Sequence, residues 1–411
     1  MILTRHSLPL LVLLAAQLLC LAACSRTMPA PRGADLARRF VLVDTHVDLP
    51  MRLVTHMDDL GTRTPKGDFD LPRARAGGLD APFMSIYIPA SYQKSGGAKA
   101  YADRLIDLVE DLPRRWPEAF VIARSPDEVR RHAAAGMISL PMGMENGAGI
   151  EDDLANLRHF YDRGVRYITL THGEDNLICD SSYNEKQRRW HGLSPFGRQV
   201  VQEMNRLGIM VDVSHISDEA FTQVMELSRA PVIASHSSCR HFTPKFERNM
   251  SDDMIRQMAA KGGVLQINFG SAFLTEAANV SGKARYDAVT AYREANGITA
   301  DDDPRAEQFE AQYKKDHPPV FATLDDVVAH IDHVVRLAGI DHVGIGSDFE
   351  GVGDSLPEGL KDVSAYPNLI DALLAKGYSE ADVEKICGGN VLRVWSEVEA
   401  AAGALSAEPK P

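Results

Sequence analysis

Short apolar runs recur along the chain, and most are followed by a stretch with helical periodicity. Several runs are rich in Val and Ile without strict alternation, which is typical of strands that are covered on both faces. This pattern predicts eight buried strands. They lie at 40–43, 83–88, 138–142, 165–170, 209–213, 232–234, 264–267 and 342–345.

The intervening segments predict helices with recognisable starts. Ser217 and Ser251 precede acidic residues, where short polar side chains cap helix N-termini. The expected helices are 100–111, 152–163, 195–207, 218–228, 252–261 and 324–338, with closing helices at 365–376, 379–386 and 390–400. Eight strands with intervening helices favour an α/β fold, a closed (β/α)8 TIM-like barrel. A doubly wound open sheet is the alternative.

One segment breaks this rhythm between the seventh strand and its returning helix. Residues 271–320 are charged and lack strong apolar periodicity, and they predict a helical insertion over the barrel mouth. We expect the barrel domain to span 40–400 and the Ala-, Ser- and Pro-rich residues 401–411 to form a disordered tail.

The N-terminus has the pattern of a secretory signal. Arg5 and His6 precede an apolar segment at 8–19, and Leu-Ala-Ala-Cys ending at Cys24 resembles a bacterial lipobox. We therefore predict a signal peptide at 1–23, lipidation of Cys24 and a tether at 24–39, with an ordinary cleavage site as the alternative. Ser25 after the cysteine favours the outer membrane of a Gram-negative bacterium, where a lipid-anchored protein would face the periplasm.

Composition narrows the class of protein. Of 411 residues, 45% are hydrophobic and 25% charged, as in a globular protein with a large core. The net charge of −13, without a basic run, argues against nucleic-acid binding. Cys179, Cys239 and Cys387 permit at most one disulfide, and the lack of a CxxC spacing argues against thiolate zinc ligation.

Six chelating side chains fall where apolar runs end. They are His46, Asp48, Glu145, His215, His236 and Asp348. Barrel enzymes build their sites from the C-terminal ends of several strands, so we expect these side chains to meet there. Imidazole and carboxylate ligands suit zinc, manganese or cobalt, which indicates a metal-dependent hydrolase.

The spacing predicts how two ions would be shared. His215 and His236 could hold one ion with Glu145, while His46 and Asp48 hold the other. A carboxylate that bridges two ions is a common arrangement, and Asp348 could accept a proton from the activated water. Each residue alone has a structural alternative: an incidental HxD, a surface Glu, a core His or a helix-capping Asp.

The ordered motifs resemble the membrane (renal) dipeptidase family of the amidohydrolase superfamily. They are DTHVDLP, MGMEN, YITLTH, VDVSHIS, PVIASHSS, RNMSDD, HVGIGSDFEGV and GGNVLRVW. The resemblance spans residues 40 to about 398. It implies a (β/α)8 barrel with two Zn²⁺ ions bridged by a glutamate and a hydroxide, and hydrolysis of dipeptides, including those that end in a D-residue. A homodimer is compatible with the family.

Matching motifs imply a role for each site residue. His46, Asp48 and Glu145 would hold one ion, and Glu145, His215 and His236 the other. Further roles fall to His172, which would polarise the scissile carbonyl, to Arg248, which would receive the substrate's terminal carboxylate, and to Asp348, which would assist proton transfer to the leaving amine and hold the free amino group. Without the resemblance, Arg248 would be expected to be a solvated surface residue.

One departure concerns substrate contacts. Gly270 stands where a tyrosine often follows Asn-Phe in the family, so a contact is missing or replaced. Two other functions are open. Another binuclear amidohydrolase, acting on a lactone or amide, would often carry HxH and a carboxylated lysine, which this chain lacks. A non-catalytic peptide-binding lipoprotein would have no need for the metal ligands.

Overall fold

Eight parallel strands form a single sheet in the computed structural model, which describes residues 32–299 and 303–407. The strand order is β1-β2-β5-β6-β7-β8-β9-β10. The strands are β1 Leu42–Val47, β2 Leu79–Tyr87, β5 Met142–Glu145, β6 Val165–Thr169, β7 Met210–Asp212, β8 Ile233–Ser237, β9 Val264–Ile267 and β10 Val343–Ile345.

The sheet closes almost completely between its first and last strands. Val47 forms a parallel bridge with Phe349, just beyond β10. The backbone N–H of Asp48 donates to the carbonyl of Phe349 at 2.9 Å, and that of Asp348 donates to the carbonyl of His46 at 3.1 Å. The predicted (β/α)8 barrel is therefore confirmed, and the open doubly wound sheet is excluded.

The third predicted strand is divided in two at Pro141. β4 (Ile138–Leu140) pairs with β3 (Phe120–Ile122) in a separate two-stranded sheet, whereas β5 enters the barrel. Proline has no N–H to donate, so it interrupts a ladder at this point. The division lets the chain step into the barrel before Glu145.

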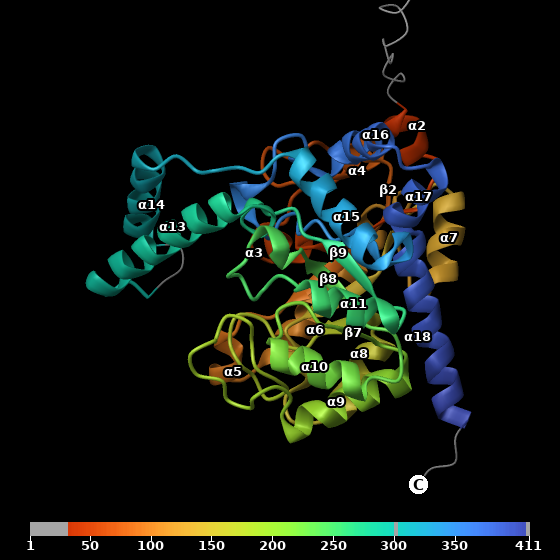
Figure 1. The fold of residues 1–411 in the computed structure, drawn as a ribbon, viewed down its shortest axis with the longest axis horizontal. Coiled ribbons are helices and arrows are strands. Elements are labelled where there is room, and N and C mark those ends of the chain that lie inside the picture. The colour runs from red at the N-terminus through yellow and green to blue at the C-terminus, as the bar shows by residue number, and fades with distance from the viewer. Residues whose placement is uncertain (1–31, 300–302, 408–411) are drawn as a thin grey trace, which may run out of the picture.

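Helices surround the sheet, as Figure 1 shows. The longer helices near the barrel are α6 Ala98–Arg115, α7 Pro126–Ala134, α8 Ala155–Asp162, α9 Pro195–Leu207, α10 Asp218–Leu227, α11 Asp252–Ala260, α15 Leu324–Ala338, α16 Tyr366–Lys376 and α18 Asn390–Ala407. Shorter ones are α2 Gly33–Ala37, α3 Leu49–Thr55, α4 Leu71–Gly77, α5 Ser91–Ser95 and α17 Glu380–Glu384. Serine side chains cap α9, α10 and α11, because each accepts a hydrogen bond from a backbone N–H of the first turn.

The segment between β9 and α15 is helical. It contains α12 Ser271–Leu274, α13 Glu276–Ala295 and α14 Pro304–Asp316. The aromatic rings of Tyr292 and Phe309 stack 4.3 Å apart and join α13 to α14. Figure 1 shows these two helices reaching outward from the barrel body.

One end of the barrel is plugged by aromatic side chains. Phe83, Tyr167 and Trp395 are fully buried, and the ring centroids of Phe83 and Trp395 lie 5.4 Å apart. A Cβ atom on Gly143 would lie 1.9 Å from the Tyr167 ring, so glycine is required beside it. This packed layer supports the strand ends that carry the polar residues.

Both ends of the domain differ from expectation. The predicted tether includes α2, where Leu36 and Ala37 are buried and the backbone N–H of Gly33 donates to Asp371 at 2.8 Å. The last helix was expected to end near residue 400, but α18 continues to Ala407, because its Ala-rich end favours helix. Cys24 and the signal segment lie outside the described residues.

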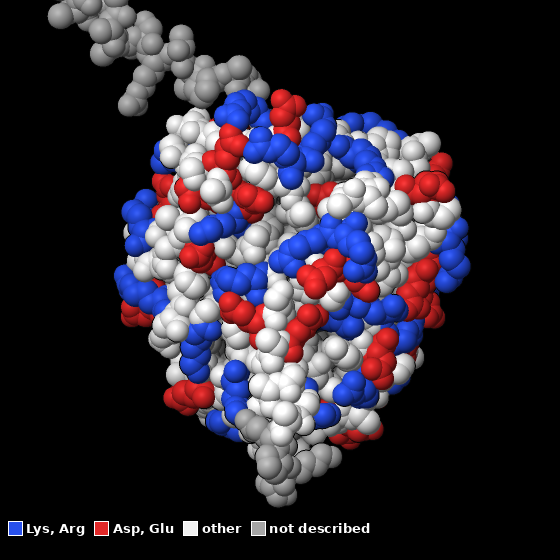
Figure 2. Space-filling model, turned by 90° about the vertical axis from the view of Figure 1, so that its right-hand side faces the viewer, with Lys and Arg blue, Asp and Glu red and all other residues white. Residues whose placement is uncertain are grey.

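The described part of the chain also bears on the predictions about disulfides, membrane spans and surface charge. Cys179, Cys239 and Cys387 are buried free thiols there, so they form no disulfide with one another. No helix in 32–299 or 303–407 has both the length and the apolarity for a membrane span. Figure 2 shows basic and acidic side chains interspersed over one face.

Candidate active site

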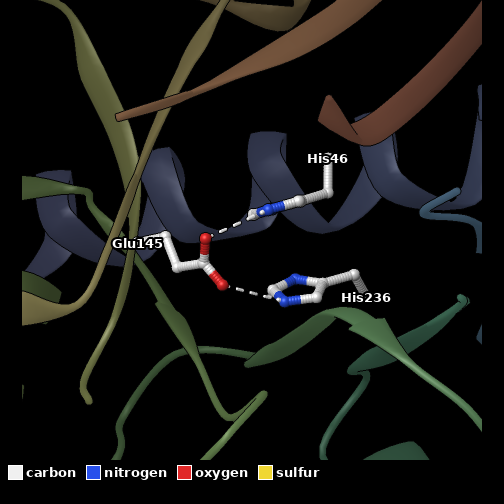
Figure 3. A group of neighbouring side chains, drawn as sticks. All are labelled: His46, Glu145 and His236. Atoms are coloured by element: carbon white, nitrogen blue, oxygen red, sulfur yellow. Dashed lines mark ion pairs between the residues drawn. The ribbon is translucent and has the colours of Figure 1, made fainter. Parts of the chain in front are cut away.

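The ends of the barrel strands bring the predicted polar side chains together. Glu145 lies at the centre, with its carboxylate oxygens directed to imidazoles from different strands. Oε2 lies 3.4 Å from Nε2 of His46, and Oε1 lies 3.2 Å from Nε2 of His236. Figure 3 shows the two rings on the same side of this carboxylate, each facing one oxygen.

A tyrosine fixes the ring of His46. The hydroxyl of Tyr167 donates to the carbonyl of Thr45 at 2.9 Å and lies 2.8 Å from Nδ1 of His46. Because this hydroxyl has only one proton to donate, Nδ1 of His46 must carry its own hydrogen. Nε2 therefore presents a lone pair, and within the described residues it has no hydrogen-bond partner. Such an orientation by the second nitrogen is usual for metal-binding histidines.

His236 is held by the same logic. Its Nδ1 lies 2.7 Å from Oγ of Ser235, and that hydroxyl donates to Asp212 at 2.5 Å. Nε2 of His236 therefore also presents a lone pair. This nitrogen lies 2.9 Å from Nε2 of His215. Nε2 of His215 is 3.1 Å from Oε1 of Glu145.

This donor set fits divalent metal ions. Lone pairs and carboxylate oxygens repel one another at such distances unless a cation lies between them. Donor atoms within 4.8 Å of one another form three overlapping groups: His46, Glu145 and His236; Glu145, His172 and His215; and His46, Asp48 and Asp348. All five predicted metal ligands thus lie in one cluster, with Glu145 shared.

The pKa directions of three ligands agree with the charge states that metal ligands need, and that of a fourth does not. Burial acts to lower the pKa of His46, but Tyr167, Asp48 and Glu145 hold it well above its ordinary value, a direction that a bound cation would oppose. Burial and the neighbouring cationic groups lower the pKa of His215 and His236 well below the ordinary value, so both rings are neutral. Burial acts to raise the pKa of Glu145, but the surrounding histidines hold it well below its usual range. Neutral imidazole and ionised carboxylate are the forms that bind zinc.

Asp348 faces the cluster from the loop that follows β10. Its backbone is left-handed (φ 64°), and Nδ2 of Asn268 donates to its Oδ2 at 2.7 Å. A Cβ on Gly351 would lie 2.3 Å from carboxylate oxygens of both Asp48 and Asp348, so glycine allows the two acids to approach. Burial and the nearby carboxylates raise the pKa of Asp348 to about 7, which suits proton transfer near neutral pH.

His172 completes the ring of histidines. Its Nε2 lies 3.6 Å from Oε1 of Glu145, its ring centroid is 4.3 Å from that of His215, and the Tyr87 ring contacts it edge-on at 4.9 Å. Burial lowers its pKa, so the ring is a neutral N–H donor.

Arg248 is buried, in contrast to the solvated position that the sequence alone favours. It is 3% exposed, and it donates to Oγ of Ser237 at 2.6 Å and to the carbonyl of His236 at 2.7 Å. The guanidinium lies 5.3 Å from the centroid of the Phe273 ring. Burial raises the pKa of Tyr183, and the nearby Arg248 acts in the opposite direction. Both rings line the catalytic cavity, so Arg248 lies directly behind its wall.

The cavity has a volume of about 420 Å³. Its lining includes Tyr87, Tyr183, Phe273, Val352 and Glu350, none of which the sequence indicated as a site residue. They lie outside the chelating pattern, and only their spatial position identifies them. At Gly270 a Cβ would lie 2.8 Å from Val352 and 2.9 Å from Phe273, so those two side chains occupy the space that a larger residue would need.

The fold and the donor cluster define a metallohydrolase built on a (β/α)8 barrel. Residues 31–409 match the family described as membrane dipeptidase, peptidase family M19. An uncharacterised dipeptidase of Schizosaccharomyces pombe is 32% identical over 387 residues, which cover 90% of this chain and 84% of that protein. The chain belongs to the membrane dipeptidase family and is a metallo-dipeptidase.

Solved structures agree with this assignment. The probable dipeptidase PvdM from Pseudomonas aeruginosa is 30% identical with a TM-score of 0.77, and the match covers 90% of this chain and 98% of that one. A metallopeptidase from Rhodobacter sphaeroides, solved with a phosphinate mimic of the dipeptide L-Ala-D-Ala, is 26% identical with a TM-score of 0.71. This second match covers 87% of this chain and 99% of that one.

Proposed function

We propose that this metallo-dipeptidase uses two zinc ions to hydrolyse free dipeptides and accepts a D-residue at the C-terminal position. The observation that carries the proposal is the shared carboxylate of Glu145, which faces the Nε2 atoms of His46, His215 and His236 at 3.1–3.4 Å. The tolerance of a D-residue draws on the Rhodobacter sphaeroides relative, whose bound ligand mimics L-Ala-D-Ala.

Glu145 would belong to both metal positions, with His46 and Asp48 at one and His215 and His236 at the other. Other divalent ions suit the same ligands. When bound, such ions supply an activated water nucleophile and a Lewis acid for the peptide carbonyl. Tyr167 and Ser235 keep His46 and His236 in the tautomers required for this.

The other residues act on the substrate. Asp348 would pair with the free α-amino group and carry a proton to the leaving amine, for which its pKa of about 7 is suited. His172 would donate to the oxygen of the scissile carbonyl as negative charge develops there. Arg248 would attract the terminal carboxylate, a role that requires the rings of Tyr183 and Phe273 to leave its guanidinium accessible.

The test is hydrolysis of L-L and L-D dipeptides beside an N-blocked dipeptide and a tripeptide, with zinc content measured on the same sample. We expect cleavage of free dipeptides alone and about two zinc ions per chain at the catalytic site. The Glu145→Gln variant should lose its catalytic zinc and its activity. Zinc-loaded protein that leaves every dipeptide intact would contradict the proposal and favour another amidohydrolase substrate, such as a lactone or another amide.

We also propose that the mature chain begins at a lipidated Cys24 and faces the periplasm from the outer membrane. The lipobox-like sequence before Cys24 supports this position. Mass spectrometry of the purified N-terminal peptide should give a triacylated cysteine, and a Cys24→Ala variant should leave the membrane fraction. An unmodified Cys24 in the mature protein would contradict the lipid anchor. A homodimer is also compatible with the family. Sedimentation of the barrel domain in detergent-free solution tests this oligomeric state.

A further inference from the structure

Three metal-ligating side chains meet at a second position, and none of them lines the catalytic cavity. They are His241 from the loop after β8, Asp252 from the first turn of α11 and His333 from α15. Their donor atoms lie within 4.8 Å of one another. Nε2 of His333 is 2.7 Å from Oδ1 of Asp252, and the rings of His241 and His333 stack with centroids 4.4 Å apart.

The donor set has the composition of a zinc-type site. Two imidazoles and one carboxylate leave a fourth position for water, as in zinc sites with three protein ligands. An ion pair between His333 and Asp252 would by itself need no further partner, yet His241 adds a second imidazole from a different element. His241 is exposed and Asp252 is partly exposed, so an ion can enter from solvent.

The surrounding groups are compatible with a bound cation. His330 lies on the same helix but is occupied, because Nδ1 accepts from the backbone N–H of Cys239 and Nε2 lies 3.0 Å from the carbonyl of Leu274. The nearby guanidinium of Arg336 has its ion pair with Asp332 at 3.7 Å. The cluster therefore keeps three donors for a metal.

We propose that His241, Asp252 and His333 bind a divalent transition-metal ion of the zinc type at a peripheral site distinct from the catalytic one. The ion would join the loop after β8 to α11 and α15. The same loop carries Arg248, and backbone contacts join its two ends. Cys239 forms a parallel β-bridge with Met250, and the backbone N–H of Arg240 donates to the carbonyl of Met250 at 2.8 Å. Metal at His241 would therefore fix the segment on which Arg248 depends.

Zinc content after equilibrium dialysis tests the proposal on the full-length protein. Compared with the wild type, His241→Ala should bind about one zinc ion fewer, since one of three protein ligands is removed. It should keep its catalytic zinc and its kcat. The variant replaces an exposed side chain and should fold, which its circular dichroism spectrum checks.

Two further variants separate this site from the catalytic one. Glu145→Gln should lose activity and catalytic zinc but retain the ion that His241→Ala loses, so the two proposals can fail independently. His317→Ala, which removes an exposed histidine outside the cluster, should bind as much zinc as the wild type. Equal zinc content in His241→Ala and the wild type would overturn the peripheral site, as would an equal loss in His317→Ala.

Discussion

Asp348 combines a left-handed backbone, a hydrogen bond from Asn268 and a carboxylate close to that of Asp48. The properties of this residue depend on both the local sequence and the folded barrel. The apolar run before it predicts a strand end, but its near-neutral pKa depends on burial beside other acids that lie far away in the chain.

Replacing Asp348 by Asn tests its role in proton transfer. The amide keeps the shape of the side chain but cannot carry the proton, so we expect kcat to fall by about 10²–10⁴-fold. Zinc content should stay at the wild-type value, in contrast to Glu145→Gln. Kinetics and metal analysis of the same preparation measure both, and a variant within a few-fold of wild-type kcat would exclude Asp348 as the proton carrier.

Gly270 is the residue at which the sequence predicts a departure from the family pattern. Its φ of −55° is open to any residue, so the constraint is steric. We expect Gly270→Ala to lower the free energy of unfolding by about 1–3 kcal/mol, because its Cβ would crowd Val352 and Phe273.

A second substitution distinguishes this cause from others. Val352→Ala opens space beside residue 270, so the double variant should be more stable than the sum of the two single changes predicts. Chemical denaturation of the four proteins gives the coupling energy. Additive effects would mean that the space around Gly270 adjusts without cost.

At the scale of elements, α15 is linked to the loop after β8 by a buried histidine. His330 is hydrogen-bonded at both nitrogens, and burial lowers its pKa to about 4. The folded state therefore binds fewer protons than the unfolded state between pH 6.5 and 4, and stability falls as the pH drops through that window. Above pH 6.5 the contribution is complete.

Replacing His330 by Gln removes this proton linkage. We expect the wild type to lose up to about 3 kcal/mol more than the variant between pH 7 and pH 4. Urea unfolding at several pH values measures the difference. His56→Gln, at a side chain that is 80% exposed, is the control and should keep the wild-type pH dependence. Parallel pH curves for the wild type and His330→Gln would contradict the assignment.

The strands and most helices follow from local pattern, but their ends do not. Pro141 divides one apolar run between two sheets: the proline marks the break, but the pairing of the first half with a separate strand is seen only in the fold. The helical character of residues 271–320 is expected from the sequence, whereas the pairing of α13 with α14 depends on packing such as that of Tyr292 on Phe309.

For the whole molecule, the segment before β1 belongs to the folded domain. Leu36 is 1% exposed and α2 lies against α16, where Asp371 accepts from the backbone N–H groups of Arg32 and Gly33. We expect Leu36→Ala to cost about 2–5 kcal/mol of stability, as buried leucines usually do. Deletion of residues 1–31 should leave the barrel active.

Thermal and chemical unfolding of the wild type and of Leu36→Ala measures whether this segment stabilises the folded domain. Val280→Ala serves as the matched control, because that side chain is 61% exposed and should change stability by less than about 0.5 kcal/mol. If Leu36→Ala unfolds like the control, residues 32–39 act as the tether that the sequence suggested.

The sequence by itself determined the barrel and its chelating residues, because burial on both faces and strand ends leave a local pattern of apolar and polar positions. Only the tertiary structure decided which atoms face each other, and with them the tautomers of His46 and His236, the burial of Arg248 and the space beside Gly270. The physical reason is that hydrogen bonds, electrostatic shifts and steric limits depend on distances between residues far apart in the chain. Tyr167 shows this dependence: it reaches His46 across 121 positions of sequence, a contact that no local pattern contains.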